Sequence, residues 1–134
     1  GLYPSADTLT NPKIQMALAA KAAGLMPLGI LDTVANFSDA HYMYEVAKKS
    51  ANFGFEGATC IHPTMVEALN RGFSPTKEEI DEATLIIEVM KDAWQNNRGA
   101  AKLNGKMIDM PVYRRAIDVL RRCDLIREKQ NHTR

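Results

Sequence analysis

Residues 53–63 read FGFEGATCIHP, and this stretch decides the class of fold. Residues 57–61 are a short, mostly apolar run between two turn signals, which is typical of a buried strand. His62-Pro63 breaks the run, and we expect it to open a short helix that continues through Leu69. The stretch therefore predicts a strand that leads directly into a helix.

Two helices are expected before this stretch. Asn11-Pro12 is typical of a helix start, with asparagine as the N-cap and proline at the first helical position, and Gly24 ends this helix. Ser38-Asp39 provides an N-cap for the second helix, whose amphipathic pattern runs to Asn52.

A further strand is expected between these two helices. Residues 26–34 form an apolar run whose only polar side chains are Asp32 and Thr33. Helices that alternate with buried strands predict a parallel sheet of the α/β class. Two strands cannot make a stable parallel sheet that is covered on both faces, so this pattern implies that further strands of the sheet lie outside the chain.

The pattern changes after residue 73, and we therefore divide the chain into residues 1–73 and 74–134. Thr76 and Glu79 form a capping box at the start of a helix of about 20 residues. Asn104-Gly105 lies between two short apolar runs, which is the strongest local signal of a β-hairpin. A last helix is expected to follow Pro111.

The composition excludes several classes of protein. The chain has 134 residues, 46% apolar residues and a formal net charge of +1, so it lacks the basic excess of a nucleic-acid-binding domain. It has no apolar run long enough to span a membrane, and its two cysteines have no metal-ligand spacing, which favours free thiols in the cytoplasm. The chain starts at Gly1 without methionine, which indicates a processed or tagged end, or a piece of a longer protein.

Four residues are candidates for a functional site, and each also has a purely structural interpretation. His62 follows a predicted strand, where ligands bind in parallel α/β folds, but it also fits a residue that starts a helix. Asp32, at the end of the other strand, is placed to help bind a metal or to orient a ligand. Asp109 and Asp39 both precede helices, so a catalytic carboxylate cannot be distinguished there from a helix cap by spacing alone.

Four blocks of the sequence, in this order, resemble the citrate lyase beta-subunit family, which includes malyl-CoA, citramalyl-CoA and citryl-CoA lyases and related aldolases. Residues 53–63 resemble its LGFxGxxxIHP signature, and residues 73–80 resemble its FSPSxEEV segment. Residues 99–111 resemble its GAxxLDGKMIDxP segment, with Asn104 in place of an aspartate, and residues 14–24 resemble its AAxAAG helix.

This resemblance implies an α/β fold in which the chain is the C-terminal half of a (β/α)8, or TIM, barrel. Residues 1–73 would be late βα units, and residues 74–134 a helix–hairpin–helix extension that serves as a lid over a neighbouring subunit. His62, Pro63 and Asp32 would then bind the substrate or its CoA group. Asp109 matches the family aspartate that acts as a general acid or base.

The implied reaction is reversible carbon–carbon cleavage of a 3-hydroxyacyl-CoA, helped by a divalent metal, usually Mg²⁺. The metal ligands of the family lie earlier in its barrel, so no metal ligand is expected in this chain. The family also implies a homotrimer or homohexamer. A non-catalytic relative that binds CoA or a partner chain is the alternative, and a free-standing α/β domain is a third interpretation.

Overall fold

The computed structural model describes residues 3–35 and 38–132, so the Gly1-Leu2 start of the chain lies outside the described residues. The chain divides into two compact units, residues 1–73 and residues 74–134. Each unit has its own hydrophobic core. In the described part of the chain, no helix has the length and apolar character needed to cross a membrane.

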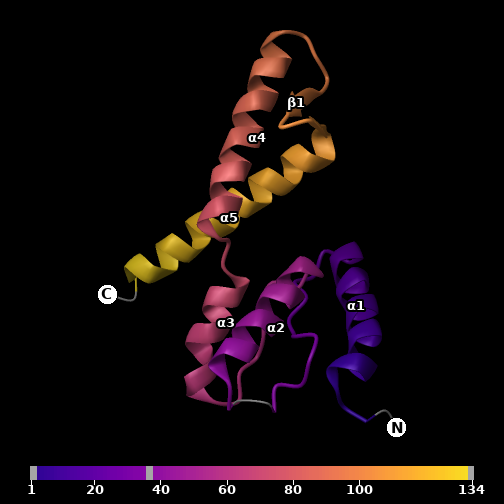
Figure 1. The fold of residues 1–134 in the computed structure, drawn as a ribbon, viewed down its shortest axis with the longest axis vertical. Helices are drawn as coiled ribbons and strands as arrows, with labels where there is room; N and C mark the ends of the chain where they lie inside the picture. Colours follow the sequence, from indigo (N-terminus) through magenta and orange to yellow (C-terminus); the bar gives the residue numbers. More distant parts are fainter. Residues whose placement is uncertain (1–2, 36–37, 133–134) are drawn as a thin grey trace. The chain divides into compact units, whose positions relative to one another are not determined.

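Over residues 3–35 and 38–73, the first unit contains three α-helices and one short 3-10 helix, which follow one another along the ribbon in Figure 1. Their bounds are α1 Ala6–Ala22, α2 Ala40–Asn52, η1 Pro63–Met65 and α3 Val66–Phe73. The expected start of the first helix at Asn11-Pro12 is wrong. Ser5 is the N-cap of α1 and forms a capping box with Thr8, so the helix begins earlier and Pro12 lies inside it.

The two predicted strands are reduced to one isolated bridge. Leu28 and Gly57 pair in parallel, with hydrogen bonds from Gly29 N to Gly57 O (2.8 Å) and from Glu56 N to Pro27 O (3.0 Å). The parallel direction agrees with the α/β class, but full strands over residues 26–34 and 57–61 were wrong for this chain.

Helix side chains bind the backbone where the first strand was expected to continue. The amide of Leu31 donates to the Ser50 hydroxyl of α2 at 2.9 Å. The ammonium of Lys13 in α1 donates to the carbonyl oxygens of Ile30 (2.8 Å) and Asp32 (2.6 Å). These side chains satisfy backbone groups that a neighbouring strand would bind. The chain bends at residues 31–32 and does not continue as a strand.

Helices α2 and α3 pack closely in the first unit (Figure 1). Gly72 of α3 lies against α2, where an added Cβ would come within 2.5 Å of Ala47 Cβ and 2.8 Å of Tyr44 O. The guanidinium of Arg71 lies 5.3 Å from the centre of the Tyr44 ring. These contacts fix the helix that follows His62.

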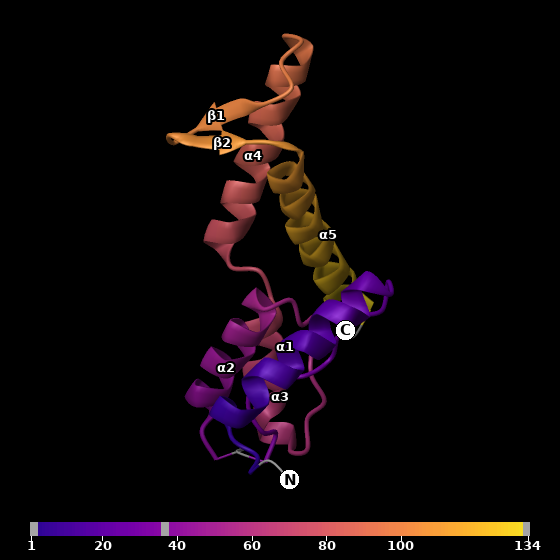
Figure 2. The same cartoon turned by 90° about the vertical axis from the view of Figure 1, so that its right-hand side faces the viewer.

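The second unit is a pair of long helices joined through a hairpin (Figure 2). Its elements are α4 Lys77–Gln95, β1 Ala101–Leu103, β2 Lys106–Ile108 and α5 Met110–His132. The Thr76–Glu79 capping box, the hairpin at Asn104-Gly105 and the helix at Pro111 are all confirmed.

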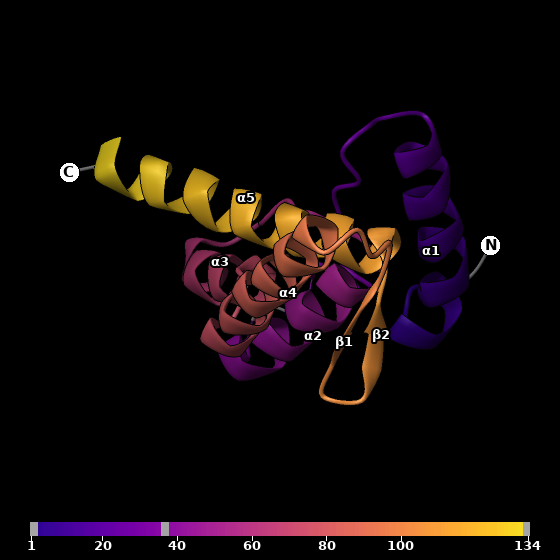
Figure 3. The same ribbon diagram turned by 90° about the horizontal axis from the view of Figure 1, so that it is seen from above.

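Apolar residues of α4 and α5 meet in the core of this unit. Met90 and Ala83 of α4 are buried with Ala116 of α5, and Trp94 packs edge-on against Tyr113 with ring centres 4.8 Å apart. The hairpin extends sideways from this helix pair (Figure 3), and of β2 only Ile108 is buried. The chain therefore leaves β2 beside the packed pair α4 and α5 and enters α5 after Asp109.

Candidate active site

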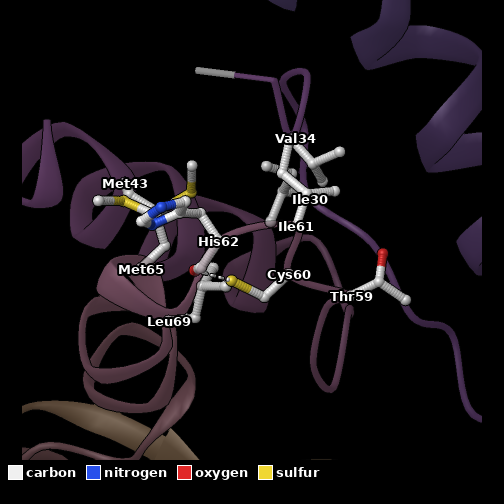
Figure 4. A pocket seen from close by; sticks show the side chains of 9 residues that line it. All are labelled: Ile30, Val34, Met43, Thr59, Cys60, Ile61, His62, Met65 and Leu69. Atoms are coloured by element: carbon white, nitrogen blue, oxygen red, sulfur yellow. Dashed lines mark hydrogen bonds between the residues drawn. The ribbon is translucent and has the colours of Figure 1, made fainter. Parts of the chain in front are cut away.

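The carboxyl ends of the two extended segments meet at a small hollow in the first unit (Figure 4). Because the segments run parallel, the residues after the Leu28–Gly57 bridge reach the same edge. The lining is mostly apolar and comprises Ile30, Val34, Met43, Thr59, Cys60, Ile61, His62, Met65 and Leu69.

His62 lines this hollow and also starts the helix after it. Its imidazole lies with Met43 and Met65 on one side of the hollow, whereas Ile30 and Val34 stand on another (Figure 4). Nδ1 of His62 accepts a hydrogen bond from the Thr64 amide at 3.3 Å, and the Thr64 hydroxyl lies 2.8 Å from the same atom. His62 therefore lines the hollow and caps the following helix at the same time, so its position fits both a residue at a binding site and a residue that starts a helix.

The residues beside His62 shape the turn. Pro63 occupies the first position of η1, which its fixed backbone angle suits, and it is exposed. The exposed thiol of Cys60 donates to the carbonyl oxygen of His62 at 2.8 Å (Figure 4). The turn that presents the imidazole is therefore held by local hydrogen bonds.

Asp32 is buried, with 8% of its surface exposed, and both of its carboxylate oxygens are engaged. The Tyr42 hydroxyl donates to Oδ2 at 2.5 Å, and the Thr33 amide donates to Oδ1 at 2.7 Å. Asp32 is not among the residues that line the hollow. The carboxylate holds the end of the first extended segment onto α2.

Lys13 and Tyr42 complete this cluster, and sequence reasoning missed both. Burial of the ammonium lowers the pKa of Lys13, and the nearby charge of Asp32 opposes this shift. The hydrogen bond to Asp32, with a further contribution from burial, raises the pKa of Tyr42. The only local signal for Tyr42 is its place in the first turn of α2, and that place alone does not indicate its contact with Asp32.

We expect Tyr42 to ionise at a higher pH than an ordinary tyrosine does. Its pKa is raised in the folded protein, so the stabilisation it contributes is complete below its ordinary pKa of 10.0 and is lost as the pH rises through the folded value. Ultraviolet absorbance of tyrosinate measures this titration. Asp32→Asn removes the charge beside the phenol and should return the pKa of Tyr42 towards its ordinary value.

The control for this titration is Tyr44→Phe, which should leave the late component in place, whereas Tyr42→Phe should remove it. A late component that survives in Tyr42→Phe would contradict the assignment.

Asp109 lies in the second unit, between β2 and α5, and occupies the N-cap position of α5. Its Oδ1 accepts a hydrogen bond from the Val112 amide at 3.1 Å, and its carbonyl oxygen accepts one from the Tyr113 amide at 2.9 Å. Asp39 has the same role at α2, where the Tyr42 amide donates to its Oδ1 at 3.0 Å. The capping interpretation of both aspartates is therefore observed.

Residues 3–35 and 38–132 contain no group of three or more His, Cys, Asp or Glu side chains that could hold a metal ion. The side chains that the structure describes thus do not form a metal site. Within the same residues, Cys60 and Cys123 are free thiols.

No family model matches the chain. Known proteins do: the citrate lyase subunit beta of Escherichia coli K12 is 33% identical over 128 residues, which is 94% of this chain and 42% of that protein. The corresponding subunit of Leuconostoc mesenteroides is 32% identical over 89% of this chain and 39% of that protein. Human mitochondrial citramalyl-CoA lyase is 30% identical over 86% of this chain and 33% of that enzyme.

Solved structures agree with these matches. CitE from Mycobacterium tuberculosis, in complex with magnesium, acetoacetate and coenzyme A, has a TM-score of 0.69 and 30% identity over 82% of this chain and 39% of that chain. A citrate lyase from Burkholderia xenovorans has a TM-score of 0.67 and 27% identity over 87% of this chain and 35% of that chain.

The fold and the relatives that share it place the chain among the homologues of CoA-thioester lyases. More particularly, the chain is homologous to citrate lyase beta subunits and citramalyl-CoA lyases, which confirms the resemblance read from residues 53–63 and the other three blocks. The chain spans about two fifths of the length of the citrate lyase subunits it matches.

Proposed function

We propose that this chain is part of a carbon–carbon lyase that cleaves or forms a 3-hydroxyacyl-CoA of the malyl, citramalyl or citryl type. The observation that carries the proposal is the match over 94% of this chain to a citrate lyase subunit beta. The CitE neighbour, which is in complex with magnesium, acetoacetate and coenzyme A, supports the same class of ligands.

Residues 1–73 are proposed as two late βα units of a TIM barrel. The parallel bridge and the helices that follow each extended segment support this, since a barrel repeats that unit. Residues 74–134 are proposed as a lid extension. The hairpin packs against α4 and leads directly into Asp109, which supports a role in carrying Asp109 to a substrate.

Within this scheme, His62 and Pro63 bind the substrate or its CoA group at the carboxyl end of the second segment, where the hollow lies. Asp32 contributes from the neighbouring end. Its carboxylate is already bound by Tyr42, so it acts by fixing the wall of the site. Asp109 is the group that gives or takes a proton during bond cleavage.

The proposed cofactor is Mg²⁺, with a CoA thioester as the substrate. The described side chains do not fit a metal site, so the ligands are proposed to lie outside this chain. When bound, the ion would stabilise negative charge on the oxo-acid and its enolate. The residues of this chain would bind and orient the substrate and exchange a proton with it.

The full-length protein should cleave malyl-, citramalyl- or citryl-CoA when Mg²⁺ is present, and chelation of the metal should abolish the cleavage. Chromatography of the CoA species would measure the reaction. If the protein binds these thioesters without cleaving any of them in Mg²⁺, the lyase proposal fails and the alternative, a non-catalytic CoA- or partner-binding relative, is favoured.

We also propose that the protein is a cytoplasmic homo-oligomer, a trimer or a hexamer, which acts on small molecules and not on nucleic acid or membranes. The exposed apolar side chains of the second unit, Met107 and Leu125 among them, support burial against another subunit. Light scattering of the full-length protein would measure the mass, and a monomer would contradict the proposal.

A further inference from the structure

The turn of the hairpin combines two exposed residues in an uncommon backbone conformation. Asn104 and Gly105 have φ angles of 49° and 80°, which is the type I′ turn that Asn-Gly sequences favour. An added Cβ at Gly105 would meet no atom within 4 Å, so nothing covers the turn in the described residues of this unit. The side-chain amide of Asn104 and the backbone beside it are therefore open to water.

Asparagine before glycine can react with its own backbone. The amide nitrogen of the following residue attacks the side-chain carbonyl carbon, a five-membered imide forms and ammonia leaves. Water then opens the ring at either carbonyl, which gives aspartate or isoaspartate. The attack is fastest before glycine because no side chain hinders the approach. We propose that Asn104 is a site of spontaneous deamidation.

The closed turn limits this reaction, since the pairing of Leu103 with Lys106 holds both turn residues in the left-handed region. The reaction therefore proceeds from the opened hairpin. Opening is inexpensive here because each strand has three residues and, of β2, only Ile108 is buried. The rate of deamidation thus reports how often this hairpin opens.

The two products affect the hairpin differently. Aspartate tolerates the left-handed conformation as asparagine does, so it keeps the turn and adds a negative charge two residues before Lys106. Isoaspartate places an additional atom in the backbone, which disrupts the register of Lys102 with Met107. Because β2 leads directly into Asp109, the isoaspartate product disturbs the approach to the α5 cap.

The chain contains an internal control. Asn97 is also exposed and has a φ of 55°, but Arg98 follows it. The full-length protein is incubated at mildly alkaline pH, digested and mapped by mass spectrometry. We expect the peptide with Asn104 to gain the mass of one amide-to-acid exchange several times faster than the peptide with Asn97. It should separate into two products, one of which is a substrate of isoaspartate methyltransferase.

Two further samples make the result decisive. A synthetic peptide of residues 100–109 gives the rate of the open chain, and Asn104→Gly keeps the turn without the reactive amide. Reaction of Asn104 in the protein, slower than in the peptide and absent in Asn104→Gly, supports the proposal. The proposal is overturned if Asn104 stays intact in the protein while the peptide reacts. It is also overturned if Asn104 deamidates no faster than Asn97.

Discussion

In the full-length protein, Asp109→Asn is expected to lower kcat by about a hundredfold to ten-thousandfold, the range that general acid–base groups contribute. Asparagine cannot exchange a proton near neutral pH, but it is as good an N-cap as aspartate. The Val112 amide would therefore keep its partner, and α5 should start where it does now. Steady-state kinetics measure the loss, and thermal unfolding checks that the fold is retained.

The matched control is Asp39→Asn, which makes the same exchange at the cap of α2, where the Tyr42 amide is the donor. This variant should retain its activity. Asp109→Ala is a poorer test, because loss of the cap alone costs about 1 kcal/mol of stability. Full turnover in Asp109→Asn would remove Asp109 from the mechanism and leave it as a helix cap only.

The second large effect concerns stability, where Gly72→Ala is expected to lower the free energy of unfolding by about 2 kcal/mol. The new methyl group would lie 2.5 Å from Ala47 Cβ and 2.8 Å from Tyr44 O, so α2 and α3 must separate. The backbone atom cannot move out of the way as a flexible side chain does. The clash must also exceed the gain of about 1 kcal/mol that alanine normally brings to a helix.

Gly99→Ala is the control for this substitution, since an added Cβ there meets no atom within 4 Å. Denaturant unfolding of both variants compares the two sites. A Gly72→Ala protein as stable as Gly99→Ala would contradict the prediction, because separating α2 and α3 would then cost no more than the gain of about 1 kcal/mol that alanine brings to the helix.

Local signals in the sequence were sufficient for the second unit. The Thr76–Glu79 capping box and the Asn104-Gly105 turn involve residues within a few positions of each other, so the sequence pattern contains the whole interaction. The strands expected in the first unit would depend on partners that are distant in the sequence. Nothing near residues 26–34 indicates that Lys13 and Ser50 bind the backbone that a strand would have used.

The candidate site follows the same division. His62 was predicted at a strand end, and it lines the hollow where the two extended segments meet. The cap at Asp109 was one of two stated interpretations, and it is the one that local geometry can test. The cluster of Lys13, Asp32 and Tyr42 joins three elements, so no spacing rule in one segment could reveal it.

The helix side chains that bind the first extended segment also obstruct an edge at which another chain could pair. Unpaired strand edges recruit strands from other molecules, and natural proteins often block such edges with lysine. Here Lys13 covers the carbonyl oxygens of Ile30 and Asp32, and Ser50 covers the amide of Leu31. An incoming strand would have to displace these groups before its pairing could extend past Ile30.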